Sequence, residues 1–255
     1  MRLRWLASLG VALVLAALGR GGPLPCGVCK GVQAGHLVLP EEGTRHFQVI
    51  PYFPQAGDVL LFDDEDPIYR LMFKAAGTGP PDHVAIVFAR EDGLPALLDL
   101  TGPTVKSAKV SLLDVLPRLQ KYHGVITVRR PRQQLTPQQS AELRHFAQEQ
   151  QGKEFAYGRM LLQGTPFRCR IGLRHYLFAG TCMDRSRWLC SELVVAAATS
   201  AHVLDAKRFP ANSMYPRDLA YDEKYDLSGI YHAPILWVPD PQPPIRGSVV
   251  DVFLK

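Results

Sequence analysis

The 255-residue sequence lacks the patterns that mark several large functional classes. No long basic tract alternates with aromatic residues, which argues against nucleic acid as a partner although the formal net charge is +5. There are no internal repeats. Seven of the eight histidines match no metal-ligand spacing, so we predict no metal and no organic cofactor. These seven are His36, His46, His123, His145, His175, His202 and His232.

The first apolar run is too short for a comfortable membrane span. It follows Arg2 and Arg4, covers residues 5–18 and includes the small-x-small pattern Ala17-Leu18-Gly19. This arrangement is typical of a secretory signal peptide, so we predict a signal peptide at residues 1–19 and an exported protein. An uncleaved membrane anchor is the alternative. The mildly basic charge is interpreted first as a solvated basic face, and the alternative is peripheral contact with an anionic surface such as envelope polymers or lipid headgroups.

The rest of the chain divides into three parts by composition. Residues 20–50 are rich in glycine and proline and are interpreted as a linker or loosely packed lead-in. Residues 51–240 have the length of one ordinary domain with a single core. Residues 241–255 begin with a proline-rich stretch and are interpreted as a C-terminal tail.

Hydrophobic patterning predicts mixed strands and helices within residues 51–240. Short apolar or β-branched runs predict strands at residues 59–62, 84–88, 95–100, 105–110, 125–128 and 235–238. Helical spacing predicts helices at residues 64–76, 112–116 and 188–200, the second of them stopped by Pro117. Thr136, Pro137 and Gln139 form a capping-box signature for a helix that ends at Gly152. Residues 164–182 are interpreted as an irregular insertion.

Five cysteines leave one unpaired if the others form disulfides in an oxidising compartment. Cys169 and Cys182 bracket a loop and are predicted to pair. Cys26 and Cys29 form a C-x-x-C pair, interpreted as a local tether or disulfide, with a redox pair as the alternative. Cys190 remains as the odd thiol. It is either a reactive nucleophile or an inert buried cysteine.

Two strings point to thiol chemistry. Asp82-His83-Val84 places a histidine at the mouth of a buried strand, and Leu189-Cys190-Ser191 places a cysteine at the start of a helix. A helix N-terminus and a nearby imidazolium both lower the pKa of a thiol, and the thiolate is the reactive form. We therefore predict Cys190 as nucleophile and His83 as base.

A carboxylate on the neighbouring strand completes this hypothesis. Asp99 lies inside an apolar strand, where an unpaired charge is costly, and a hairpin would bring it next to His83. We predict that Asp99 orients His83. The alternative is a strand-edge histidine bonded to Asp82. Glu192 is interpreted as structural rather than catalytic.

Several strings occur in a recognisable order: Gly57-Asp58-Val59, Asp82-His83-Val84, Leu98-Asp99-Leu100, Gly152-Lys153-Glu154 and Cys190-Ser191-Glu192. This series resembles the circularly permuted NlpC-type papain-like amidases, the YiiX-like group, and is more distantly similar to lecithin:retinol acyltransferase-type proteins. The resemblance covers residues 50–240.

The resemblance implies an α+β fold with a permuted papain-like core, in which an antiparallel sheet packs on the nucleophile-bearing helix. It also implies that Cys190 attacks, that His83 is the base and that Asp99 orients it, although family members often carry glutamate at the third position. We predict an exported cysteine hydrolase that cleaves an amide bond in a cell-envelope peptide. A thiol acyltransferase, lipid amidase or esterase is the first alternative, because the chain has no separate wall-binding repeat. A non-catalytic papain-fold binding module is the second.

Overall fold

The computed structural model describes most of the chain beyond its N-terminal segment. The described residues are 29–40, 47–64, 67–163, 165, 170 and 172–239. The predicted signal peptide and the C-terminal tail lie outside these ranges, so both stay predictions. None of the helices in these ranges is long and apolar enough to cross a membrane.

Within the described residues, the strands form one ten-stranded sheet with the order β2-β1-β10-β7-β3-β4-β5-β6-β8-β9. The strands are β1 (His36–Pro40), β2 (Phe47–Pro51), β3 (Val59–Asp63), β4 (His83–Ala89), β5 (Pro95–Thr101), β6 (Lys109–Asp114), β7 (Val125–Arg129), β8 (Glu154–Phe155), β9 (Arg187–Trp188) and β10 (Ile235–Val238). The central strands β3, β4 and β5 are antiparallel and almost wholly buried. Their long apolar runs are explained by this burial.

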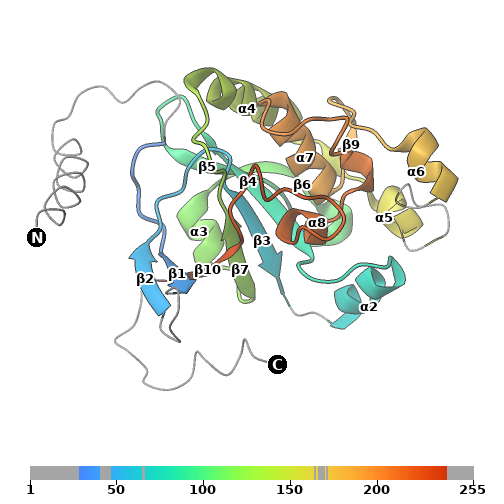
Figure 1. The fold of residues 1–255 in the computed structure, drawn as a ribbon, viewed down its shortest axis with the longest axis horizontal. Helices are drawn as coiled ribbons and strands as arrows, with labels where there is room; N and C mark the ends of the chain where they lie inside the picture. The colour runs from blue at the N-terminus through green and yellow to red at the C-terminus, as the bar shows by residue number, and fades with distance from the viewer. Residues whose placement is uncertain are drawn as a thin grey trace, which may run out of the picture.

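Helices cover the sheet and surround it (Figure 1). They are α2 (Pro67–Ala75), α3 (Val115–Gln120), α4 (Pro137–Gln150), α5 (Tyr157–Gln163), α6 (Gly172–Phe178), α7 (Cys190–Ser200) and α8 (Pro216–Ala220), with 3₁₀ turns η1 (Val105–Ser107) and η2 (Ala211–Ser213). Helices α4 and α7 pack against each other and both pack on β4. The α7 side chains from Ser191 to Ala198 are all buried, as the apolar composition of this segment predicts. The expected mixture of helices with one large sheet is confirmed.

The capping signature at the start of α4 is confirmed. The Thr136 hydroxyl accepts a hydrogen bond from the Gln139 backbone N–H, and the Gln139 side chain accepts one from the Thr136 N–H. Pro137 occupies the first helical turn, where its missing N–H leaves no bond unmade. This local chemistry needs no tertiary contact, which is why the sequence alone predicts it.

The predictions for residues 105–116 are wrong. The strand β6 begins at Lys109 and continues to Asp114, and the helix α3 begins only at Val115. Leu112 and Leu113 therefore lie in the sheet, opposite Leu98 and Leu97. Pro117 lies in the first turn of α3 and does not end a helix, because the first helical N–H groups have no intrahelical acceptor in any case.

Part of the predicted lead-in belongs to the sheet. Strand β1 pairs with β10, placing Leu37 opposite Trp237, and β2 pairs with β1 at the edge. The side chains of Phe47 and Val49 on β2 are exposed, so this edge strand adds little to the core. The predicted irregular insertion likewise contains a helix, α6.

Candidate active site

Cys190 is the first residue of α7 and lines a cavity of about 500 Å³. The preceding residue, Leu189, has an extended backbone, so α7 begins abruptly at the cysteine. The backbone N–H groups of the first helical turn have no acceptor within the helix and carry its positive dipole end. The thiol therefore lies where an anion is stabilised.

His83 and Asp99 meet through the strand register. Ile86 pairs with Leu98, and continuing this antiparallel register makes His83 and Asp99 diagonal neighbours on one face of the sheet. The Nε2 of His83 lies 2.6 Å from the Oδ1 of Asp99. Asp99 is fully buried, while the His83 side chain is 23% exposed toward the cavity. The expected pairing is present, and the alternative pairing of His83 with Asp82 is not.

Cys190 lies in the same cavity wall as His83 and is near enough to contribute to the raised pKa of the imidazole, so the three predicted side chains gather at one site. Since Nε2 faces Asp99, Nδ1 is the ring nitrogen left to exchange a proton with the thiol. A carboxylate on the far nitrogen fixes the tautomer of the ring and stabilises its protonated form.

The charges of the site reinforce one another. Burial lowers the pKa of His83, but the charge and hydrogen bond of Asp99, with a smaller contribution from Cys190, outweigh burial and raise that pKa to about 10. Burial raises the pKa of Asp99, but the charges and hydrogen bonds of His83 and Arg118 outweigh it and lower that pKa to about 2. His83 is therefore held as an imidazolium, and Asp99 as a carboxylate, at neutral pH.

Arg118 is a site residue that the sequence analysis missed. Its Nε donates to the Oδ2 of Asp99 over 2.7 Å, and its guanidinium lies over the ring of Phe62 at 4.9 Å. It projects from α3 and lines the same cavity as His83 and Cys190. Its signal in the sequence is weak, because an arginine in a short helix is ordinary and its partner lies 19 residues upstream.

Contacts of two side chains, Ser191 and Glu192, hold the start of α7 in place. The Ser191 hydroxyl donates to the backbone carbonyl of Met214 at 2.7 Å. The buried Glu192 carboxylate accepts from the Leu189 N–H and forms an ion pair with Arg159 at 2.8 Å. Burial raises the pKa of Glu192, against the opposing charge of Arg159. Glu192 thus caps the helix that carries Cys190, in agreement with its structural interpretation.

The cavity beside Cys190 has a volume of about 500 Å³ and a mostly apolar lining. The apolar side chains in its wall are Phe73, Ala75, Ala76, Leu100, Pro103, Ala108, Phe155, Met160, Leu161, Leu189 and Pro216. Polar groups cluster at His83, Asp82, Asp64, Arg118 and Tyr122. A largely apolar cleft with a few convergent polar groups is the usual form of a small-molecule binding site.

The other cysteines are weaker candidates than Cys190 for a reactive thiol. Cys182 is exposed, and its predicted partner Cys169 lies outside the described residues, so their pairing remains a prediction. Cys29 is buried, and burial raises the pKa of its thiol to about 12, which disfavours redox chemistry there. Its neighbour Cys26 is outside the described residues.

Among the described residues, one group of carboxylates could hold a cation. Ligand atoms of Asp63, Asp64 and Asp82 lie within 4.8 Å of one another at one end of the cavity. Burial, a hydrogen bond with Asp64 and the Asp64 charge raise the pKa of Asp82 to about 7, and Arg70 lies 3.7 Å from Asp63. Oxygen-rich clusters of this kind suit hard cations such as Mg²⁺ or Ca²⁺, but exposed acidic groups are common without any ion.

No protein-family model matches the chain, and no curated protein matches it in sequence. One solved structure similar to it is the crystal structure of the metalloprotein yiiX from Escherichia coli O157:H7. The two chains are 15% identical, the match covers 74% of this chain and 99% of that one, and the TM-score is 0.40. A TM-score and an identity this low do not carry a fold or an activity from one protein to the other.

Proposed function

We propose that this protein is a thiol-dependent hydrolase or acyltransferase acting on an amide or ester carbonyl, with Cys190 as nucleophile. The supporting observation is that Cys190 at the start of α7 shares one cavity wall with His83, which is hydrogen-bonded to the buried Asp99. A nucleophile, a base and a residue that orients the base are the parts that covalent acyl transfer requires. The antiparallel β3–β4–β5 sheet packed on α7 supports a papain-like core as part of this proposal.

In the proposed reaction the thiol proton of Cys190 is already held by the His83 imidazolium, and the Cys190 sulfur attacks the substrate carbonyl carbon as a thiolate. The oxyanion is stabilised by the backbone N–H of Cys190, one of the free amides of the first helical turn. His83 then returns its proton to the leaving amine or alcohol as the carbonyl re-forms. Water, or a second alcohol or amine, attacks the resulting thioester and releases the acyl group and the free thiol.

The cavity lining favours an acyl substrate over a polar envelope peptide. Leu100, Phe155 and Leu189 present apolar surface close to the thiol, and each methylene buried on such surface gains about 0.8 kcal/mol. We therefore propose a lipid ester or N-acyl amide as the substrate class. An amide bond of an envelope peptide remains the competing substrate class. With either substrate, we propose that the protein is exported.

Trapping the acyl-enzyme tests the reaction. The full chain is incubated with envelope extract, quenched in acid, and the adduct on Cys190 is weighed. A fatty-acyl increment on wild type, absent from Cys190→Ala and retained in Cys182→Ala, is the expected result. Cys182→Ala is the matched control because Cys182 is exposed and lies outside the cavity. A muropeptide increment would replace the lipid assignment with the peptide one.

A chain-length series separates an enzyme from a binding module and measures the acyl preference. On straight-chain acyl esters of increasing length, kcat/KM is expected to rise about fourfold per added methylene until the cavity is full. The Cys190→Ala protein is expected to show no turnover above background. Binding of the same esters to wild type with no turnover would support a non-catalytic papain-fold module instead.

A further inference from the structure

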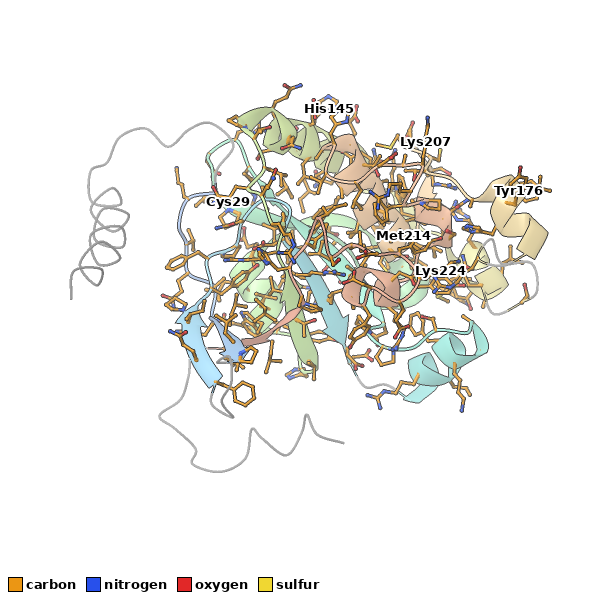
Figure 2. All side chains as sticks on the ribbon, in the orientation of Figure 1. Cys29, His145, Tyr176, Lys207, Met214 and Lys224 are labelled. Carbon is orange, nitrogen blue, oxygen red and sulfur yellow. The ribbon has the colours of Figure 1, made fainter. Side chains whose placement is uncertain are left out.

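We propose that exposed apolar side chains of α5 and α6 form a lipid-docking surface that seats the protein on an anionic bilayer beside its catalytic cavity. This docking surface consists of Leu161, Leu162, Tyr176, Leu177 and Phe178, each at least half exposed. Tyr176, which is 85% exposed, projects from α6 at the outer end of the molecule (Figure 2). Clustered exposed apolar residues mark interaction sites, whereas single ones are ordinary.

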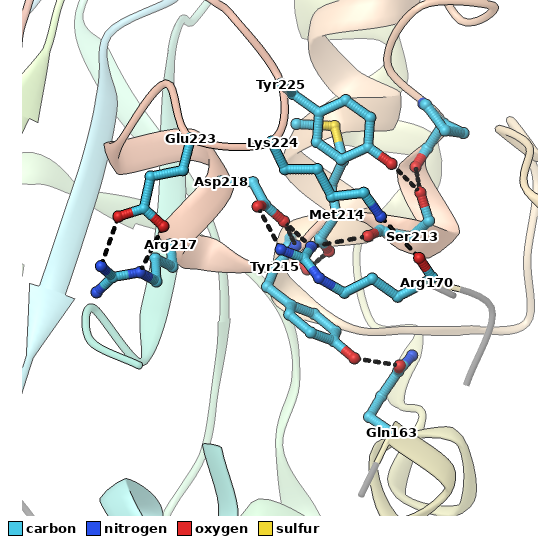
Figure 3. Close-up of polar contacts among 12 residues, drawn as sticks. Gln163, Arg170, Ser213, Met214, Tyr215, Arg217, Asp218, Glu223, Lys224 and Tyr225 are labelled. Atoms are coloured by element: carbon cyan, nitrogen blue, oxygen red, sulfur yellow. Dashed lines mark hydrogen bonds and ion pairs between the residues drawn. The ribbon is translucent and has the colours of Figure 1, made fainter. Parts of the chain in front are cut away.

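Polar contacts join the segments of these two helices to the segment from η2 to α8. Between α5 and α6, Arg170 forms a two-pronged ion pair with the buried Asp218 and lies over the Tyr215 ring at 4.5 Å (Figure 3). At the end of α5, Gln163 accepts a hydrogen bond from the Tyr215 hydroxyl at 2.8 Å. These contacts fix the backbone of both helices against the segment from η2 to α8, so the apolar side chains are displayed to solvent.

The end of α6 is fixed in the same way. The Asn212 side chain donates to the Phe178 carbonyl at 2.7 Å and accepts from the Gly180 N–H at 2.8 Å. Tyr176, Leu177 and Phe178 are consecutive, so they project in different directions from one short rigid helix. Such a tip can enter the headgroup and acyl boundary of a bilayer without any change in the rest of the fold.

The α5 part of the docking surface is continuous with the catalytic cavity. Leu161 is half exposed and also lines the cavity, next to Met160 and Gln163 of the same helix. A lipid chain leaving a bilayer held at this surface would therefore meet apolar side chains along its path to Cys190. This relation to the reaction rests on the proposed function, whereas the docking itself does not.

Charge indicates a lipid surface as the occupant. The Lys106 ammonium lies 5.6 Å from the ring of Tyr157, the first residue of α5, which gives the docking surface a basic and aromatic border. Without the predicted signal peptide, whose only charged side chains are those of Arg2 and Arg4, the formal net charge of the chain falls from +5 to +3. Basic and aromatic side chains flanking an apolar surface are typical of contacts with anionic headgroups.

Vesicle co-sedimentation of the full chain tests the proposal. The vesicles contain phosphatidylcholine alone or with about one third phosphatidylglycerol. The test variant is Leu162→Asp with Leu177→Asp, whose side chains are 50% and 57% exposed and do not line the cavity. The matched control is Val49→Asp with Phe47→Asp, 47% and 56% exposed on the edge strand β2. Both variants add two negative charges, and equal thermal unfolding midpoints verify their folding.

Wild type and the β2 control are expected to bind the anionic vesicles, and the α5–α6 variant to bind at least tenfold more weakly. Binding to neutral vesicles should be weaker for all three proteins. Equal binding by both variants, or no binding by wild type, would overturn the proposal. The three proteins are also compared without vesicles. If wild type and the β2 control self-associate and the α5–α6 variant does not, the surface binds a second copy of the chain, and the proposal is overturned. Cys190→Ala should bind like wild type, so this result is separable from any failure of the catalytic proposal.

Discussion

Arg118 donates a hydrogen bond from Nε to the Oδ2 of Asp99 over 2.7 Å, while His83 binds the other oxygen of the same carboxylate. The fully buried Asp99 therefore has two cationic partners. Burying a carboxylate is costly unless it is paired and hydrogen-bonded, so this double pairing explains how an ionised group persists inside an apolar strand.

Asp99→Asn is expected to lower kcat about a hundredfold or more while the protein stays folded. The amide keeps the volume of the side chain but removes the charge that stabilises the His83 imidazolium and fixes its tautomer. The pKa of His83 should fall from about 10 toward its ordinary value of 6.5. The rate of Cys190 alkylation by iodoacetamide, followed site by site across pH, measures this shift. An unchanged pH profile would show that Asp99 does not act on His83.

Arg118→Met tests a positioning role. Removing the guanidinium leaves the Oδ2 of Asp99 without its donor, which should cost about 1–3 kcal/mol in the free energy of unfolding. If Arg118 also aligns Asp99, kcat should fall about tenfold at unchanged KM. Arg118→Lys should restore little of either quantity, since an ammonium lacks the planar donor geometry of Nε. A stability loss with full kcat would limit Arg118 to a structural role.

The pairing of His83 with Asp99 makes stability depend on pH at both ends. The raised pKa of His83 contributes stability that is complete below pH 6.5 and is lost as the pH rises to about 10. The lowered pKa of Asp99 contributes stability that is complete above pH 3.8 and is lost as the pH falls to about 2. Urea midpoints should therefore show this contribution at its largest between pH 4 and 6.5, and much less of it in Asp99→Asn. Equal pH dependence in both proteins would contradict the pairing.

How much of this arrangement was predictable depends on the distance between partners in the chain. The Thr136 cap and the His83–Asp99 hairpin depend on local chemistry and on one short turn, so the sequence was enough to predict both. Strand β1 pairs with β10, which is about two hundred residues away in the chain. The residues around β1 contain no pattern that predicts which strand it pairs with. The prediction that Pro117 ends a helix is wrong because proline is common both after a helix and within its first turn, and the sequence does not distinguish the two positions.

A glycine pair gives a stability test of the turn before β3. Gly57 has φ +91°, and a Cβ there would lie 2.9 Å from the Pro131 Cγ and 2.7 Å from the Leu135 Cδ1. Gly152 has a similar φ of +82° with no atom within 4 Å of the added Cβ. Both substitutions by alanine carry the backbone cost of a left-handed residue, about 1 kcal/mol. Only Gly57→Ala also forces a displacement in the packed core.

Gly57→Ala should therefore lower the free energy of unfolding by about 1–3 kcal/mol more than Gly152→Ala does. The Leu135 methyl can move, but the Pro131 ring is rigid, so the turn itself must shift. That turn is fixed by the Gln55 N–H donating to Asp58 and by the Gly57 N–H donating to the Val87 carbonyl of β4. Chemical denaturation of the two variants in parallel provides the measurement. Equal losses would mean that backbone strain alone, and not the approach of Pro131, makes glycine necessary at position 57.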